Sequence, residues 1–315
     1  MRRSSCTTWY LTIEYFGCWP AKSVSKIKMD LDLRTQYWYD REARNAFKKF
    51  ILDIHGLDFS LWESHGFWDD RYTPFSLFNG SEVISSVCIY LLDAIVQGES
   101  TSLVQISGVG THEKWRRQGL SRQLTDEGLK WAHNKHAGVF LFADDDAIPY
   151  YQKCGFKPIE EYLEHQKVPS VLAKPGCIPL DPEDPEDLAL IYSYAQSRTP
   201  ISNIFSIMNA KLLMFHVLYT LKNNIYEIPD LNCLIFYKRE RNCLNIFDIV
   251  SERMPSFEQL LPYIVRDTDQ TVEFHFHTDK LGIEQIETKA LAGNNTFVKM
   301  GFPLTRPVFP YTSRA

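Results

Sequence analysis

The sequence predicts a mixed α/β fold with two domains. A buried strand, an amphipathic helix and a second buried strand follow one another across residues 103–143, and this order forms a βαβ unit. An Asn79-Gly80 pair between two apolar runs indicates a β-hairpin before that unit. A Pro-rich segment, 169–185, then divides the chain. With 315 residues and 44% hydrophobic content, each part is long enough to bury a core.

The composition excludes several classes of protein. A net charge of −5 and an isoelectric point near 6.0 give no general attraction to nucleic acid or anionic membranes, so we expect neither as a partner. No run approaches the ~20 apolar residues of a membrane-spanning helix. The seven cysteines are scattered and form no Cys-x-x-Cys pair, which argues against disulfides or structural zinc and favours the cytoplasm. The pairs His133/His136 and His275/His277 lack further ligands, so we expect no metal cofactor.

The first 29 residues are predicted to form a disordered leader. Two arginines precede a short apolar run at 9–13, which resembles the start of a signal peptide. Glu14 interrupts that run, and no small-residue cleavage site follows. Met29 opens a more regular segment and is an alternative start of the native chain.

Two helices and the hairpin are predicted before the βαβ unit. Apolar residues recur at helical spacing across 40–54, with basic residues on the other side, which is typical of an amphipathic helix. A shorter helix is expected over 59–65. Strand-forming runs at 75–78 and 83–92 flank the Asn-Gly turn, because this pair readily supplies the positive φ angles of a tight turn.

The βαβ unit places a polar loop where ligands commonly bind. A strand is predicted over 103–109, a helix follows Gly119, and the run 138–143 is apolar throughout, as in a strand covered on both faces. Such a crossover is almost always right-handed, which puts the loop before the helix at the carboxyl end of the first strand. Ligands of α/β proteins bind at this end of the sheet.

The second part of the chain is predicted to mix helices and strands. Helices are expected over 186–196 and 256–265, and strands over 231–250 and 271–277. The residues 296–302 weakly resemble 150–156, which suggests that the second part is a diverged copy of the first. The predicted division is therefore a leader at 1–29, a first domain at 30–168, a linker at 169–185 and a smaller second domain at 186–315.

The loop before the predicted helix has the chemistry of an anion site. Backbone N–H groups at a helix N-terminus have no carbonyl partner within the helix, and with the positive end of the helix dipole they suit a diphosphate. Gly119 lets a ligand approach the backbone closely. The side chains of Arg116, Arg117 and Arg122 can add charge-assisted hydrogen bonds.

A second motif follows the second buried strand, and together the two resemble the GNAT acetyltransferase superfamily. The acetyl-CoA loop of that family reads Arg/Gln-x-x-Gly-x-Gly/Ala, and this chain has Arg116-Arg117-Gln118-Gly119-Leu120-Ser121. The later signature of the family, Asn-x-x-Ala-x-x-Phe/Tyr-Tyr-x-Lys-x-Gly-Phe, is matched by Asp144, Ala147, Tyr150, Tyr151, Lys153, Gly155 and Phe156. The departures from the pattern are Ser121 for a smaller residue and Asp144 for asparagine.

The resemblance implies a fold and a site. The fold would be a mixed, centrally splayed sheet flanked by helices, with Ser107-Gly108 as the bulge that opens it. Acetyl-CoA would be the cosubstrate, and Tyr151 would protonate its departing thiolate as a general acid. The pantetheine arm would pair with the backbone of Val109, Gly110 and Thr111, and Asp144 would lie near it. The diphosphate would be held by Arg116, Arg117, Gln118, Gly119, Leu120, Ser121 and Arg122.

The implied reaction is direct transfer of an acetyl group to a primary amine in a ternary complex. The alternative is a non-catalytic module that binds CoA or a partner protein, with Tyr151 as a packed core residue; a longer acyl donor is a further option. His112, Glu113 and ordered water are candidates for the base that takes the amine proton. The second domain would resemble a degenerate GNAT repeat that shapes the acceptor cleft, with Phe205 and Phe236 among its aromatics. The acceptor and the oligomeric state stay open.

Overall fold

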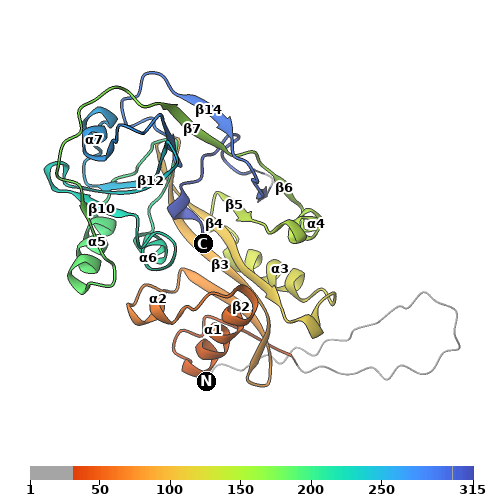
Figure 1. The fold of residues 1–315 in the computed structure, drawn as a ribbon. Helices are drawn as coiled ribbons and strands as arrows, with labels where there is room; N and C mark the ends of the chain where they lie inside the picture. The colour runs from red at the N-terminus through yellow and green to blue at the C-terminus, as the bar shows by residue number, and fades with distance from the viewer. Residues whose placement is uncertain (1–30, 300) are drawn as a thin grey trace, which may run out of the picture. The chain divides into compact units, whose positions relative to one another are not determined.

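The computed structural model describes residues 31–299 and 301–315, and it confirms the mixed α/β class (Figure 1). The predicted leader and the alternative start at Met29 lie outside the described residues. The described chain forms two compact units. The first unit combines 31–60, 70–89 and 107–133, and the second contains the remainder. Strands β3 and β4 each run from one unit into the other.

The elements up to the Pro-rich segment agree with most of the predicted ones. In chain order they are β1 (Asp32–Thr35), α1 (Arg41–His55), α2 (Ser60–Ser64), β2 (Tyr72–Asn79), β3 (Glu82–Val96), β4 (Glu99–Thr111), the 3₁₀ helix η1 (Glu113–Trp115), α3 (Leu120–Ala132), β5 (Gly138–Phe142), η2 (Asp145–Ala147), α4 (Ile148–Lys153), β6 (Phe156–Pro158) and β7 (Tyr162–Lys167).

The elements after residue 167 include several that the sequence did not predict. They are β8 (Ile178–Pro179), α5 (Pro185–Ser197), β9 (Phe205–Ile207), α6 (Ala210–Tyr219), β10 (Ile225–Ile228), η3 (Pro229–Leu231), β11 (Cys233–Glu240), β12 (Cys243–Ser251), α7 (Phe257–Ile264), β13 (Thr271–Phe274), β14 (Glu287–Ala290), β15 (Thr296–Lys299) and η4 (Tyr311–Ser313).

Helix α1 packs against the β4 strand of the first unit. The side chain of Asp40 caps the helix by accepting a hydrogen bond from the Ala43 N–H at 3.0 Å, and Gly56 ends it in the left-handed conformation. The apolar face of α1 meets two glycines of β4: a Cβ atom added at Gly110 would lie 2.8 Å from Ile54. The absence of side chains at these positions lets the helix approach the strand closely.

Helix α3 packs against the other face of the same strands. A Cβ atom added at Gly128 would lie 2.6 Å from Ile89 of β3, so this helix also approaches the sheet through a glycine. The ring of Trp131 meets Phe75 of β2 edge to face, with centroids 5.8 Å apart. The first unit therefore has three layers, with α1 and α3 on opposite faces of its strands (Figure 1).

The first sheet continues in the second unit with a strand from late in the chain. Strands β4 and β5 are parallel, and β15 lies between β5 and β6, antiparallel to both. The weak similarity of 296–302 to 150–156 does not reflect a repeated structure, because β15 is extended whereas Tyr150 and Tyr151 lie in helix α4. The two segments therefore adopt different structures despite their similar sequences.

The second sheet has the strand order β14-β7-β13-β12-β11-β10-β8 among the described residues. Only β12 and β13 pair in parallel; the other registered pairs are antiparallel. Figure 1 shows β7 beside β14 at one edge. Strand β7 precedes the Pro-rich segment, whereas β9 and β15 follow it and belong to the first sheet. The division at 169–185 stays a prediction, and the two sheets do not follow it.

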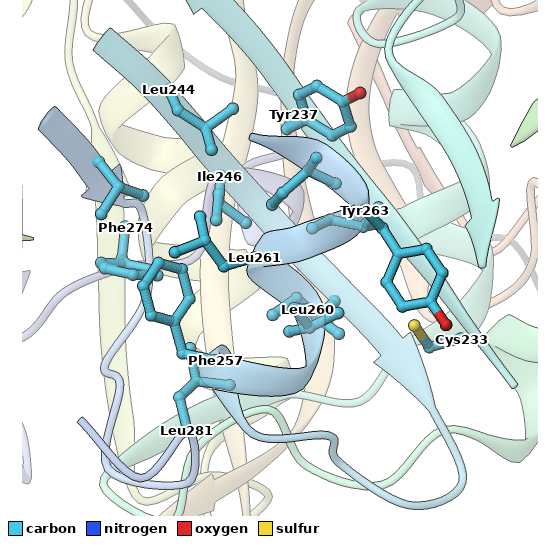
Figure 2. Close-up of a cluster of buried hydrophobic side chains, with 14 of the residues drawn as sticks. Cys233, Tyr237, Leu244, Ile246, Phe257, Leu260, Leu261, Tyr263, Phe274 and Leu281 are labelled. Carbon is cyan, nitrogen blue, oxygen red and sulfur yellow. The ribbon is translucent and has the colours of Figure 1, made fainter. Parts of the chain in front are cut away.

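A buried apolar cluster holds α7 on the second sheet (Figure 2). The helix begins with a capping box in which Ser256 and Gln259 exchange hydrogen bonds. Its Leu260 side chain is fully buried, and Phe257 meets Phe274 of β13 edge to face at 5.3 Å between centroids. Burying such side chains stabilises the fold by roughly 1.5–3 kcal/mol each.

Two histidines of the second unit, the buried His216 and the half-buried His275, are held in the neutral form. The Nε2–H group of His216 donates to the Arg314 carbonyl at 2.7 Å, and Nδ1 lies 2.9 Å from the Thr220 hydroxyl. Burial lowers the pKa of His216 and of His275 to about 4 each. Because an unfolded histidine titrates near ~6.5, the unfolded chain takes up these protons first as the pH falls.

We therefore expect the free energy of unfolding to fall between pH 6.5 and pH 4.5. Each buried histidine contributes a slope of about 1.4 kcal/mol per pH unit in this range. His216→Gln should reduce the pH dependence by about that amount, measured by urea denaturation at a series of pH values. The exposed His133→Gln is the control and should leave the slope unchanged. An unaltered slope in His216→Gln would contradict the assignment.

Candidate functional site

Strand β4 continues beyond its pairing with β5. The registered pairs run from Leu103 with Gly138 to Ile106 with Leu141, while β4 itself extends to Thr111. Gly108 has a φ of 53°, a left-handed angle typical of a glycine bulge, and it lies just past the last pair. The position agrees with the predicted opening of the sheet. Residues 109–111, predicted to bind a ligand through their backbone, lie in this extension.

The chain between β4 and α3 turns through two left-handed residues. Arg117 has a φ of 63°, which is uncommon outside glycine, and Gly119 has a φ of 79° at the N-cap of α3. Among the described residues, the backbone hydrogen bonds of turns and caps include none donated by the N–H groups of 117–122. These amides are available to a ligand at the positive end of a helix dipole.

Four basic residues lie within this segment or next to it in the sequence. Lys114, Arg116, Arg117 and Arg122 are all exposed, and none forms an ion pair within the part of the chain that the structure describes. The Arg116 Nε–H group donates to the Thr111 carbonyl at 3.1 Å, which fixes the start of the turn. An uncompensated positive cluster beside free amides is suited to a polyanion such as a diphosphate.

A chain of three hydroxyl groups connects the sheet to α3. The Ser85 hydroxyl of β3 lies 2.8 Å from that of Thr111, which in turn lies 2.8 Å from that of Ser121 in the first turn of α3. Sequence reasoning identified Thr111 and Ser121 but missed Ser85. No local signal could have found it, because its partner is 26 residues away in the sequence.

Tyr151 lies in the second unit, packed among aromatic rings. Tyr151 is 5% exposed. Its ring centroid lies 5.0 Å from that of Tyr150, 6.0 Å from that of Phe156 and 6.5 Å from that of Phe297 in β15. Within 31–299 and 301–315, the Tyr151 hydroxyl has no hydrogen-bond partner. A buried tyrosine usually has one, so this hydroxyl is free to serve a ligand.

The surroundings of Tyr151 keep its phenol protonated. Burial raises the pKa of Tyr151 strongly, and the negative charge of Asp144 raises it further. Asp144 occupies the N-cap position of η2, but its side chain makes no capping hydrogen bond and is exposed. The carboxylate is thus not used by the helix that follows it.

Several other predicted residues can be placed. His112 packs edge to face on Phe50 at 5.1 Å between centroids, and Glu113 is exposed in η1. Phe205 and Phe236 are completely buried, so the expectation that they line a cleft is wrong: they belong to the apolar core. Among the described residues, no group of three or more His, Cys, Asp or Glu side chains could hold a metal ion, and no helix is long and apolar enough to cross a membrane.

The first sheet, whose β4–β5 register ends at Ile106, and the exposed amides before α3 are the features to compare with known proteins. Residues 33–156 match the model of the acetyltransferase (GNAT) family. Over these residues the chain is similar to GNAT acetyltransferases. Both motifs identified in the sequence lie within the matched residues.

Solved structures show the same fold over most of the chain. A probable N-acyltransferase of unknown function from Enterococcus faecalis is 13% identical, with a TM-score of 0.55 over 90% of this chain and 74% of that one. Eis1 from Mycobacterium abscessus is 16% identical, with a TM-score of 0.52 over 86% and 73%. A GCN5-related N-acetyltransferase from Anabaena variabilis is 13% identical, also with a TM-score of 0.52 over 86% and 73%. No curated protein matches the sequence.

Substitution of Gly108 should be more costly than that of Gly119. Both are left-handed, so alanine strains the backbone by about 1–2 kcal/mol at either position. At Gly108 the added Cβ would also lie 2.9 Å from the Tyr72 hydroxyl and 3.1 Å from the Cys88 sulfur, whereas nothing lies within 4 Å at Gly119. We expect Gly108→Ala to lose about 1–3 kcal/mol more in urea denaturation, owing to overpacking. Equal losses would show that the neighbours of Gly108 yield without cost.

Proposed function

We propose that this protein is an N-acetyltransferase that moves the acetyl group of acetyl-CoA directly to a primary amine within a ternary complex. The observation that carries the proposal is the free amide groups of 117–122 beside cations without ion pairs, within a GNAT domain. We place the enzyme in the cytoplasm, in keeping with the five free cysteines among the described residues.

The donor, acetyl-CoA, would be held by its pantetheine arm and by its diphosphate. In the proposal the pantetheine amides pair with the β4 extension, as an added strand would, and Asp144 lies near this arm. The diphosphate occupies the N-terminus of α3. Support comes from the registered β4–β5 pairs, which end at Ile106 and leave 109–111 beyond them. The residues proposed to hold the diphosphate are Arg116, Arg117, Gln118, Gly119, Leu120, Ser121 and Arg122.

In the proposed reaction the amine nitrogen attacks the thioester carbonyl carbon, and the C–S bond breaks. The Tyr151 phenol donates its proton to the leaving thiolate, the amine proton passes to solvent, and the phenolate regains a proton from solvent. The raised pKa of Tyr151 means that the phenol carries its proton across the neutral range and can donate a hydrogen bond to the negative charge that develops on sulfur. Its hydrogen bond to that charge would be strong in a site shielded from water.

The second candidate is a GNAT-like module that binds CoA without catalysis. The packing of Tyr151 favours it, since a tyrosine that is 5% exposed among three aromatic rings is an ordinary core residue. The two candidates differ in one property: only the enzyme requires the phenol hydroxyl. A variant that removes this hydroxyl and keeps the ring therefore separates them.

Tyr151→Phe should lower turnover by about 10²- to 10⁴-fold, the usual contribution of a general acid. The change is measured as free thiol released from acetyl-CoA in the presence of a panel of amines. The dissociation constant of CoA, measured by calorimetry, should stay within about two-fold, because the aromatic packing is retained.

Tyr150→Phe provides the control in the same helix. It removes a neighbouring hydroxyl and should leave turnover close to that of the wild-type protein. Turnover by Tyr151→Phe equal to the wild type would remove the proposed role of this residue. Binding of CoA without thiol release from any acyl-CoA thioester, whatever its chain length, would favour the non-catalytic module.

A further inference from the structure

We infer that the three hydroxyl groups of Ser85, Thr111 and Ser121, here called the hydroxyl chain, position the segment between Thr111 and Ser121, here called the anion loop, for the diphosphate of the donor. This inference rests on the proposed function and adds positioning residues to it. GNAT domains usually have glycine or alanine where this chain has Ser121. The hydroxyl that this chain carries instead is used within the protein, as its contacts show.

The hydroxyl chain connects three elements at the point where the loop begins. Ser85 lies in β3, Thr111 is the last residue of β4, and Ser121 is the second residue of α3. The consecutive oxygens are 2.8 Å apart at both links. The chain thus ties both ends of the loop, Thr111 and Ser121, to each other and to the sheet.

The direction of the hydrogen bonds can be deduced because each hydroxyl has one proton. Ser85 donates its proton to the Gly110 carbonyl at 3.0 Å, since a carbonyl can only accept. Thr111 must then donate to Ser85, and Ser121 to Thr111. The Ser121 proton therefore points away from the anion site, so Ser121 acts on a phosphate through its backbone position and not through its hydroxyl.

Positioning has an energetic value at this loop. The loop contains three exposed cations that form no ion pair among the described residues, and left-handed angles at Arg117 and Gly119, so its conformation is not held by charge pairing. A loop that is ordered before binding loses less entropy when the ligand arrives. Loss of one hydrogen bond at the chain should weaken diphosphate binding by about three- to ten-fold.

A second hydroxyl chain in the same unit provides a matched control. Tyr37 lies 2.8 Å from Ser76, Ser76 lies 2.9 Å from Ser86, and Ser86 donates to the Phe75 carbonyl at 3.3 Å. It has the same length and the same direction, and it joins β2 and β3 without reaching the loop. Ser86→Ala breaks this control chain by removing the hydroxyl that donates to the carbonyl, which is the place that Ser85 has in the hydroxyl chain.

The experiment measures binding of two ligands by calorimetry: CoA, and pantetheine, which lacks the diphosphate. Thr111→Val and Ser121→Ala should each raise the CoA dissociation constant by about three- to ten-fold and leave that of pantetheine within about two-fold. The double variant should bind no worse than either single variant, because both break the same chain. Thr111→Ser should retain the affinity of the wild type, and Ser86→Ala should bind both ligands normally.

Three results would overturn the inference. The first is weaker CoA binding in Ser121→Ala but not in Thr111→Val, which would make Ser121 a direct ligand. The second is a loss of affinity for pantetheine equal to that for CoA, and the third is unchanged CoA affinity in both variants. Each leaves the proposed function intact, since the wild-type protein still binds CoA. Absence of CoA binding by the wild-type protein would instead remove the proposed function itself.

Discussion

The site depends on one interruption in backbone pairing. Strands β4 and β5 are parallel neighbours up to Ile106 and Leu141, and β4 then continues to Thr111 beside β3 but without a registered partner on its β5 edge. Extended backbone without a partner strand exposes N–H and C=O groups that favour pairing with another extended chain. Helix α1 makes this extension possible by packing on its glycines, which support the strand from one face while its hydrogen-bonding edge stays open. The anion loop follows directly, so a single departure from regular sheet structure precedes both halves of the proposed donor site.

Local sequence patterns predicted the elements that contain this site. Asp40 and the apolar spacing after it indicated α1, and Gly119 marked the start of α3, because caps and periodicity are encoded by neighbouring residues. Helix α6 was missed: Ala210–Tyr219 is apolar on nearly all sides, so it has no clear period that separates a buried helix from a strand. Its burial explains the composition, but burial is a tertiary property that the segment alone does not reveal.

The limits of prediction at the site have the same physical origin. The loop and Tyr151 carry family motifs, and the sequence could identify them. The role of Ser85 depends on strand pairing that brings it beside Gly110 and Thr111, and nothing near Ser85 in the sequence indicates that pairing. Whether the Tyr151 hydroxyl has a hydrogen-bond partner likewise depends on which groups the fold brings close to it, and the local sequence does not show this. Residue types predict the chemistry that is available, whereas contacts decide which of it is used.

The position of β15 has a consequence for how the chain is made. Strand β5 and strand β6 are separated in the first sheet by Thr296–Lys299, which emerge from the ribosome more than a hundred residues later. Until then, two strand edges beside the helix that holds Tyr151 have no partner, although all the motif residues have been synthesised. The domain therefore cannot be completed during translation of its own segment, and contacts this distant in sequence form slowly. In the nascent chain, these edges are the ones that chaperones or other unpaired strands would meet first.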